Sequence, residues 1–310
     1  MGKAVTSEPT FPPTVPLGTV YEEIGTDALP VGSIAGCVAL GSTLFAYSPS
    51  YSVSSPDGIV WTPTGSEVPC GAAGFGLTIV FDGAIWMFGG PDSNAYIYTT
   101  VWKSLDGITW AEVGALPDLG IWMLQPQVFE NKLWIITGGD SRKVFSSPDG
   151  AAWTEDGVDA LPFAINEFAS ASYAGKLWMF GGYLDGAPSK KVWNSADGIT
   201  WVEVGTDALP DGWVSAAACV YDNKMFLLTG AFGSAPDAYT RKVYSSTDGI
   251  TWTEAGTDAL PVGLIYSCPV VFDGRLFVVG GGDLGGDSQK VFASIGRTAP
   301  LSILVTPPTS

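Results

Sequence analysis

The fold of this chain is decided by the stretch Trp193–Trp201, which reads Trp-Asn-Ser-Ala-Asp-Gly-Ile-Thr-Trp. Four other stretches repeat its Ser-x-Asp-Gly-x-x-Trp pattern, and their Asp-Gly pairs begin at Asp57, Asp106, Asp149 and Asp248. Consecutive pairs along the chain are 49, 43, 48 and 51 residues apart. A period near 50 residues is typical of propellers and solenoids, so we predict a repeat protein.

Each Asp-Gly pair predicts a hairpin turn between two strands of a repeat. We expect a three-residue loop in which the glycine adopts the left-handed conformation and forms a bulge. This register places Trp193 opposite Trp201 and Lys191 opposite Glu203. It also pairs Lys143 with Glu155 and Lys242 with Glu254. Because opposite charges favour facing positions of paired strands, we interpret these lysines and glutamates as scaffold.

The two ends of the chain carry complementary parts of one repeat. Residues 20–30 resemble the outermost strand of the other repeats, whereas the last repeat breaks off near Ile295 without an Asp-Gly pair. We therefore expect the N-terminal strand to complete the last repeat and close the ring. The expected register sets Lys290 opposite Glu23 and Phe292 opposite Tyr21.

The repeats predict an all-β, six-bladed β-propeller of four-stranded antiparallel blades over residues 17–296. The blades fall at 33–66, 71–114, 121–157, 164–205, 213–256, and 264–296 joined by 18–25. The first strand of each blade is rich in small residues, which suits an innermost strand that converges on a narrow axis. Residues 1–16 and 297–310 are rich in Pro and Thr, and we expect them to be extended arms.

Two motifs resemble known repeats. Gly-Gly pairs after the second strand, with aromatic residues in the third and fourth strands, resemble the kelch repeat over about residues 18–296; the pairs are Gly89-Gly90, Gly138-Gly139, Gly181-Gly182 and Gly280-Gly281. The Ser-x-Asp-Gly-x-x-Trp stretch resembles the sialidase Asp box, which has one more residue between Asp and Gly. Both resemblances imply a propeller with four-stranded blades, and neither implies an activity, because both occur in proteins of unrelated function.

The composition of the chain argues against several classes of binding partner. The net charge is −17 and the chain has no histidine, so we expect no nucleic-acid partner. No run of 18 apolar residues and no apolar leader occurs, so we expect no membrane partner and no signal peptide, and hence cytoplasmic synthesis. Cys37, Cys70, Cys219 and Cys268 lack metal-binding spacing, and we interpret them as core thiols and not as disulfides. We expect no cofactor; residues 282–287 resemble a calcium loop only loosely.

One face of the ring is the better place for a site. The turns after the first and third strands are short and repeated, whereas the second-to-third loops and the linkers between blades vary and share the opposite face. The residues that we expect to bind a ligand there are Tyr96, Tyr98, Trp122, Tyr183, Asp185, Trp213, Phe232 and Tyr239. The polar residues expected on the same face are Asp92, Asn94, Asp237, Asp283 and Asp287.

Three functions compete for this face. The resemblance to sialidases would imply three arginines, a Tyr/Glu pair and an acidic residue. The four arginines are Arg142, Arg241, Arg275 and Arg297, and their repeat and turn positions do not predict a converging triad. Kelch propellers that are copper oxidases need histidine ligands. We therefore expect no enzyme, and a glycoside hydrolase is the least favoured interpretation.

The favoured interpretation is a non-enzymatic structural or adhesion protein, such as a decoration or tail component on the surface of a virion or another large assembly. We expect it to bind protein partners through the two arms. The alternative is a free lectin-like propeller whose aromatic and acidic side chains bind surface glycans.

Overall fold

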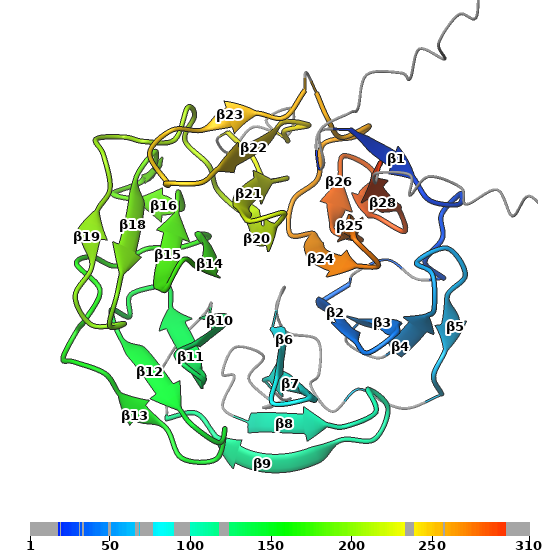
Figure 1. Cartoon of the computed structure of the whole chain (residues 1–310), viewed down its shortest axis with the longest axis horizontal. Coiled ribbons are helices and arrows are strands. Elements are labelled where there is room, and N and C mark those ends of the chain that lie inside the picture. The colour runs from blue at the N-terminus through cyan, green and yellow to red at the C-terminus, as the bar shows by residue number, and fades with distance from the viewer. Residues whose placement is uncertain are drawn as a thin grey trace, which may run out of the picture.

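Six four-stranded antiparallel sheets form a ring in the computed structural model (Figure 1), which confirms the predicted propeller. The structure describes residues 18, 20–30, 32, 34–48, 51–65, 68, 77–89, 100–117, 124–232, 239–256 and 258–295. The predicted arms, 1–16 and 297–310, lie outside these residues. No helix in the described part of the chain is long and apolar enough to span a membrane.

The first three blades follow one another along the chain. Blade 1 contains β2 (Gly36–Leu40), β3 (Thr43–Ser48), β4 (Tyr51–Ser55) and β5 (Thr62–Pro63). Blade 2 contains β6 (Thr78–Phe81), β7 (Ala84–Phe88), β8 (Thr100–Ser104) and β9 (Ala111–Ala115). Blade 3 contains β10 (Leu124–Phe129), β11 (Lys132–Thr137), β12 (Val144–Ser147) and β13 (Thr154–Glu155).

Blades 4 and 6 each add a small hairpin to this plan, whereas blade 5 follows it without one. Blade 4 contains β14 (Ala169–Tyr173), β15 (Lys176–Phe180), β18 (Val192–Ser195) and β19 (Val202–Glu203), with the hairpin β16 (Tyr183–Leu184) and β17 (Ala187–Pro188). Blade 5 contains β20 (Ala217–Tyr221), β21 (Lys224–Leu228), β22 (Val243–Ser246) and β23 (Thr253–Glu254). Blade 6 contains β24 (Cys268–Phe272), β25 (Arg275–Val279), β28 (Val291–Ser294) and β1 (Tyr21–Glu23), with the hairpin β26 (Gly282–Asp283) and β27 (Gly286–Asp287).

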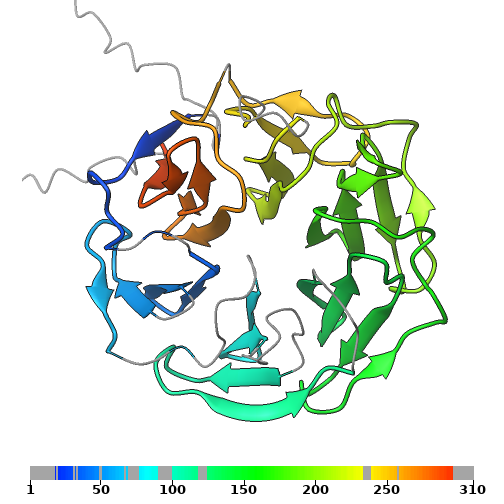
Figure 2. The same cartoon turned by 180° about the vertical axis from the view of Figure 1, so that it is seen from behind.

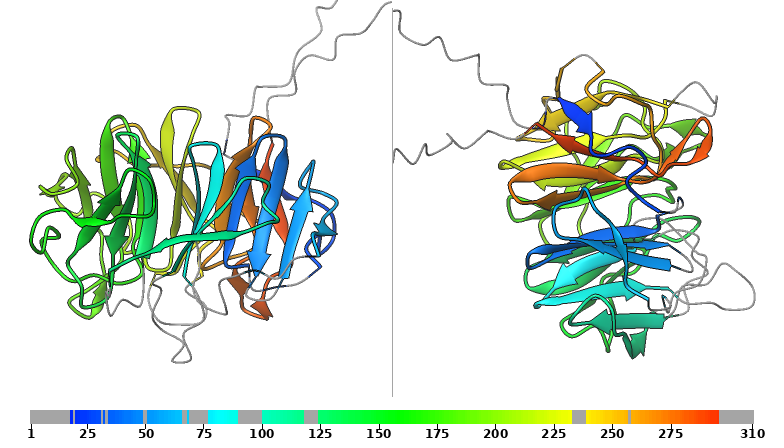
Figure 3. Two further views of the ribbon diagram at one scale, coloured as in Figure 1. Left: turned by 90° about the horizontal axis from the view of Figure 1, so that it is seen from below. Right: turned by 90° about the vertical axis from the view of Figure 1, so that its right-hand side faces the viewer.

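The first strand of every blade lies nearest the axis of the ring, and the last strand lies at its perimeter (Figures 1 and 2). Seen edge-on in Figure 3, the ring is a flat disc, and the β26–β27 hairpin stands out from one of its faces. This is the face of the second-to-third loops and of the blade linkers, and we call it the loop face.

The N-terminal strand closes the ring as predicted. β1 is the outermost strand of blade 6 and pairs antiparallel with β28, beside which it lies in Figure 2. Its register is shifted by two residues from the prediction, because Tyr21 lies opposite Ser294 and Glu23 opposite Phe292. Lys290 still reaches Glu23 diagonally, with 3.3 Å between Nζ and Oε1.

The same two-residue shift appears at the Asp-Gly turns, where the predicted three-residue loop is wrong. In blade 5, residues 247–252 separate β22 from β23. The Ser246 hydroxyl accepts the Gly249 N–H at 2.8 Å and donates to Asp248 Oδ1 at 3.0 Å. Asp248 Oδ1 also accepts the N–H groups of Ile250 and Thr251, each at 2.8 Å. These side-chain caps satisfy backbone donors inside a longer turn, so the strands need not pair close to the Asp-Gly pair.

The shifted register changes the partners of the repeat lysines only in part. Trp193 lies opposite Glu203 and not opposite Trp201. Nevertheless Lys191 contacts Glu203 at 2.8 Å, and Lys143 contacts Glu155 at 3.2 Å, because long side chains span the diagonal. Lys242 is the exception: it contacts Asp211 and not Glu254. These pairs are partly exposed, so each contributes little to stability.

A glycine–aromatic contact recurs between every two neighbouring blades. The glycine of each Asp-Gly turn lies against an aromatic ring on the second strand of the preceding blade, so closely that an added Cβ would come within 2.0–2.5 Å of a ring atom. The pairs are Gly58 with Phe277, Gly107 with Phe45, Gly150 with Trp86, Gly198 with Trp134, and Gly249 with Trp178. In blade 6, which lacks the turn, Gly18 takes this place against Phe226. The N-terminus therefore supplies both the missing strand and the missing glycine.

We predict that Gly198→Ala destabilises the protein by about 2–4 kcal/mol, because a Cβ there lies 2.0 Å from Cζ3 of Trp134 and the backbone φ is +76°. Gly175→Ala is the matched control, since Gly175 has a φ of +70° but nothing within 4 Å of its Cβ position. The control carries the backbone strain alone and costs about 1 kcal/mol. Urea unfolding measures both, and equal losses in the two variants would contradict the packing argument.

We predict that the turn aspartates make stability pH-dependent at acid pH. The hydrogen bond from the backbone N–H of Thr200 lowers the pKa of Asp197 most, burial opposes it, and hydrogen bonds from the Ile199 N–H and from Ser195 add to the lowering, so that the pKa is about 2. Because the folded-state pKa lies below the unfolded value, the stabilisation is full above the unfolded pKa of about 3.9 and is lost as pH falls toward the folded one.

Asp197→Asn should therefore melt below the wild type near neutral pH, and the difference should shrink between about pH 5 and about pH 2. Melting temperatures across this range provide the measurement. Asp106→Asn should behave in the same way, because the pKa of Asp106 is also lowered to about 2 by backbone hydrogen bonds. A difference that stays constant with pH would show that the carboxylate charge is not the stabilising group.

We predict that deletion of residues 1–25 lowers the melting temperature of the whole domain strongly, because it removes Gly18 and the buried Tyr21 and Ile24 together with β1. Deletion of residues 1–16 leaves these residues in place and serves as the control. Thermal unfolding followed by circular dichroism measures both. An unchanged melting temperature in the longer deletion would contradict closure by the N-terminal strand.

Candidate functional site

Three polar residues occupy one repeat position on the loop face near the axis. Glu167, Ser215 and Tyr266 each stand two residues before the innermost strand of blades 4, 5 and 6. All three have a left-handed backbone, with φ of +54°, +52° and +54°. This conformation costs a non-glycine residue about 1–2 kcal/mol. Glycine would avoid this strain, yet all three positions hold a residue with a polar side chain.

Hydrogen bonds join these residues across the three blades. The Ser215 N–H donates to the Glu167 carbonyl at 3.0 Å, and the Tyr266 N–H donates to the Ser215 carbonyl at 3.3 Å. The Ser215 hydroxyl donates to Glu167 Oε2 at 2.5 Å, and the Tyr266 side chain forms hydrogen bonds with both Glu167 and Ser215. We call Glu167, Ser215 and Tyr266 the axial cluster.

The axial cluster keeps Tyr266 protonated. Burial raises the pKa of Tyr266 most, a hydrogen bond with Ser215 opposes this effect, and the negative charge of Glu167 raises the pKa further. The phenol is therefore a hydrogen-bond donor at neutral pH. The cluster thus presents two hydroxyl groups and one carboxylate close together, with a second tyrosine near them.

The glycines at the ends of the second strands let these strands approach the cluster. An added Cβ on Gly182 would lie 2.8 Å from the Asn166 carbonyl oxygen, and one on Gly281 would lie 2.7 Å from that of Ile265. In blade 5, a Cβ on Gly230 would lie 2.9 Å from Cα of Ala216. Each glycine therefore packs against the segment that holds a member of the axial cluster.

The structure brings Tyr183 beside the cluster. Tyr183 and Asn166, the residue before Glu167, exchange two backbone hydrogen bonds of 2.6 and 3.2 Å. The side chain of Tyr183 is 37% exposed. Asp185 is exposed at the turn of the β16–β17 hairpin, where it has a left-handed φ of +51°. Tyr239 is half-buried and pairs with Ala231 at the edge of blade 5.

Trp213 does not lie on the surface, so the expectation of an exposed stacking residue is wrong there. Its side chain is 0% exposed and packs edge-on against Phe232 and Tyr244, with ring centroids 5.1 and 5.8 Å apart. Phe232 is half-buried over this tryptophan. Both side chains are large and apolar, so they pack into the core between blades 4 and 5 and do not stand free on the surface.

The remaining predicted residues divide into two groups. Asp283 and Asp287 lie on the β26–β27 hairpin, and Asp283 Oδ1 accepts the Gly285 N–H at 2.7 Å within that turn. In the described part of the chain, no three Asp, Glu or Cys side chains gather as a metal site would require. The predicted residues outside the described ranges are Tyr96, Tyr98, Trp122, Asp92, Asn94 and Asp237.

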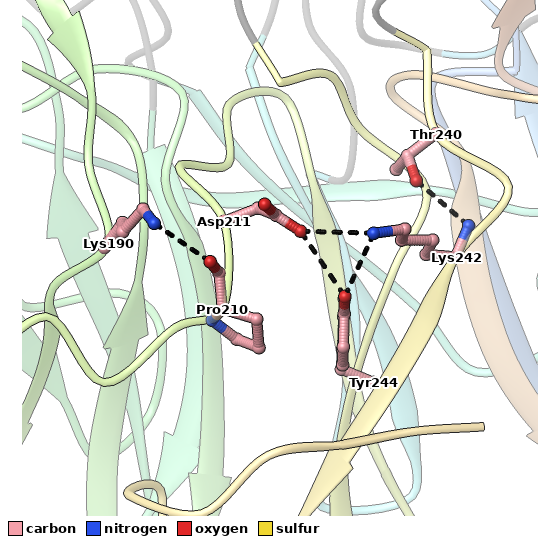
Figure 4. A network of polar contacts seen from close by, with 6 residues as sticks. All are labelled: Lys190, Pro210, Asp211, Thr240, Lys242 and Tyr244. Atoms are coloured by element: carbon pink, nitrogen blue, oxygen red, sulfur yellow. Dashed lines mark hydrogen bonds and ion pairs between the residues drawn. The ribbon is translucent and has the colours of Figure 1, made fainter.

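A second polar group lies on the linker between blades 4 and 5 (Figure 4). Lys242 Nζ donates to Asp211 Oδ2 and to the Tyr244 hydroxyl, and that hydroxyl also donates to Asp211, all at 3.4 Å. Burial lowers the pKa of Lys242, but the hydrogen bond to Tyr244 and the charge of Asp211 outweigh burial and raise it. The ammonium is also 5.4 Å from the Phe232 ring centre. This group fastens a linker to a blade.

The described arginines serve the scaffold in the same manner. Arg142 Nε donates to the Leu161 carbonyl at 2.7 Å, and Arg241 Nε donates to the Leu260 carbonyl at 3.0 Å. Arg275 Nε donates to the Ser294 carbonyl at 2.8 Å, and its guanidinium contacts Glu22. These three residues clamp linkers and strand ends of separate blades, as their repeat positions suggested. Arg297 lies outside the described residues.

Sequence reasoning missed the axial cluster, although a signal for it exists. In each of blades 4 to 6 the cluster residue stands directly after a segment that ends Ile165-Asn166, Trp213-Val214 or Leu264-Ile265. Alignment of the blades on their tight turns places Glu167, Ser215 and Tyr266 in one column. The three aligned residues are of different types, so a search for residues that repeat from blade to blade does not find them.

Comparison with known proteins identifies a family and a fold. The family model described as "DUF6242 beta propeller domain" matches residues 55–165 and 79–297. A solved structure described as "Structure of YjhT" superimposes with a TM-score of 0.68 at 16% sequence identity, covering 86% of this chain and 95% of that one. At this identity the likeness concerns the fold alone. No curated protein matches the chain.

The family match spans well over half of the chain and covers parts of all six blades. The chain therefore belongs to the family of the DUF6242 beta propeller domain.

Proposed function

We propose that this protein is a non-enzymatic adhesion or assembly propeller that binds its ligand on the loop face, at the axial cluster of blades 4 to 6. The observation that carries the proposal is the convergence of Glu167, Ser215 and Tyr266 in left-handed conformations beside the axis. Strained non-glycine residues that persist at one repeat position are typical of functional sites. The kelch-like character of the blades belongs to the same proposal and is supported by the packing of Gly182, Gly230 and Gly281.

The chemistry of the cluster favours a neutral, hydroxyl-rich ligand such as a surface glycan. A carboxylate has several acceptor sites, so Glu167 can accept hydrogen bonds from sugar hydroxyls besides the one from Ser215, and the oxygens of Ser215 and Tyr266 have lone pairs that can accept others. Tyr183, whose backbone pairs with Asn166 next to Glu167, supplies an exposed ring for stacking on a sugar face. An acidic glycan is disfavoured by Glu167 and by the net charge of −17.

Two observations support binding over hydrolysis. The three described arginines are engaged on separate blades, whereas the resemblance to sialidases would require three that converge. The pKa of Tyr266 is raised, chiefly by burial, so its phenol is a poor nucleophile at neutral pH. We therefore favour a ligand that is held and released unchanged.

The role in a larger assembly, such as a virion surface, is supported by where the two chain ends meet. The Ile295 N–H donates to the Val20 carbonyl at 2.9 Å, so the two described ends of the ring lie side by side. Segments that continue from adjacent points suit attachment to one neighbouring subunit. Deletion of both arms should leave a folded propeller and abolish co-sedimentation with its assembly. Loss of folding in that deletion would contradict a role as anchors.

We predict that Glu167→Gln and Tyr183→Ala each weaken binding of neutral glycans at least tenfold, because one loses the charged acceptor and the other the stacking ring. A glycan array, with and without calcium, identifies the ligand, and calorimetry measures affinity. Leu284→Ala is the control, since Leu284 is exposed at the tip of the β26–β27 hairpin on the same face.

Equal affinities in Glu167→Gln and Leu284→Ala would contradict binding at the axial cluster. Binding only to sialylated or sulfated glycans would contradict the assigned ligand class. A blank array would contradict the glycan proposal and leave the arms as the binding elements.

A further inference from the structure

Two buried thiols face one another across the seam where the ring closes. Cys37 lies on β2, the innermost strand of blade 1, and Cys268 begins β24, the innermost strand of blade 6. Their side chains are 7% and 5% exposed, and both belong to one core cluster that spans the two blades. Blade 6 combines strands from both ends of the chain, and blade 1 follows β1 along the sequence, so a link between the two cysteines joins the first blade to the last.

The repeat register shows how close these side chains are. Cys268 stands four residues before Phe272, which pairs with Arg275 at the tight turn, and Gly36 stands four residues before Leu40, which pairs with Thr43. Cys268 therefore occupies in blade 6 the position that Gly36 occupies in blade 1.

The same comparison fixes the position of Cys37. Cys37 stands three residues before Leu40, and Thr78 stands three residues before Phe81, which pairs with Ala84 at its tight turn. Cys37 therefore occupies in blade 1 the position that Thr78 occupies in blade 2.

The contacts between blades 1 and 2 therefore indicate which residues meet between blades 6 and 1, where the ring closes. There, a Cβ on Gly36 would lie 2.4 Å from Oγ1 of Thr78. By the repeat, the Cβ of Cys268 is directed at the side chain of Cys37, and both side chains belong to the same buried cluster. Electrostatic interaction between the two groups agrees with this geometry, because burial and then Cys268 raise the pKa of Cys37.

We propose that Cys37 and Cys268 form a disulfide across the closing seam when the chain folds in the presence of a low-molecular-weight disulfide. The thiolate of one cysteine attacks the small disulfide, which releases one small thiol and leaves a mixed disulfide on the protein. The thiolate of the second cysteine then displaces the second small thiol. Two protein thiols lose two protons and two electrons, and one small disulfide is reduced to two thiols.

The reaction belongs to folding and not to the closed ring. Both thiols are buried, and burial disfavours the thiolate that must attack. Once formed, the bond joins the first blade to the last and reinforces the closure that β1 provides by hydrogen bonds. A link between such distant positions restricts the unfolded chain strongly, so it should raise the melting temperature by about 10 °C.

The experiment refolds the denatured full chain with reduced and oxidised glutathione. We expect an intact mass lower by about 2 Da than that of the reduced protein, a Cys37–Cys268 peptide in the digest, and a raised melting temperature. The Cys70→Ser/Cys219→Ser double variant should behave as the wild type does. Cys37→Ser and Cys268→Ala should each lose the linked peptide and the thermal shift.

Several outcomes would overturn the proposal. These are an unchanged mass in wild type and double variant, a linked peptide that contains Cys70 or Cys219 in place of the seam pair, or a seam bond that lowers the melting temperature. Circular dichroism of Cys37→Ser and Cys268→Ala confirms that each variant folds, so that a missing link is not mistaken for misfolding. None of these readouts depends on ligand binding at the axial cluster.

Discussion

The structure depends on the contact between a glycine and an aromatic ring that joins each blade to its neighbour. The contact occurs at all six junctions of the ring, and no side chain larger than hydrogen fits at the glycine. The aromatic side chain of one blade packs directly on the glycine backbone of the next, and this contact sets the distance between the two sheets. The turn hydrogen bonds hold each glycine in its left-handed conformation, as the Ser246 and Asp248 side chains do for Gly249. The sixth contact uses Gly18, so the ring is complete only when the N-terminus has docked.

The same arrangement creates the axial cluster. Because the first strand of each blade converges on the axis, the residues that enter these strands come close together. Glycines at the ends of the second strands let the entry segments sit tightly against the blades, as Gly182 does against Asn166. Side chains of residues about 50 positions apart thereby share hydrogen bonds, as those of Glu167 and Ser215 do.

Charged groups serve two separate purposes in this molecule. At the rim, Lys143, Lys191 and Lys290 contact glutamates of the neighbouring strand, and Arg142 and Arg241 hold linker carbonyls. These cations recur with the repeat and serve the scaffold. Near the axis, by contrast, Glu167 is charged, whereas Ser215 and Tyr266 at the equivalent positions of blades 5 and 6 are not. A position in the repeat that varies in chemistry while its backbone stays constant is where we place ligand binding.

The sequence by itself determined the propeller, the number of blades and the closure by the N-terminal strand. These follow from the period of the Asp-Gly turns and from local strand patterns, which depend on residues close together in the chain. It did not determine the register across the turns, because an Asp-Gly pair also suits a three-residue loop, and only the backbone geometry shows the longer turn that the Ser and Asp side chains cap. It also placed Trp213 at the surface, whereas packing from two blades buries it. The axial cluster and the Cys37–Cys268 seam were decided only by tertiary structure, because each joins residues that meet only when the blades form a ring.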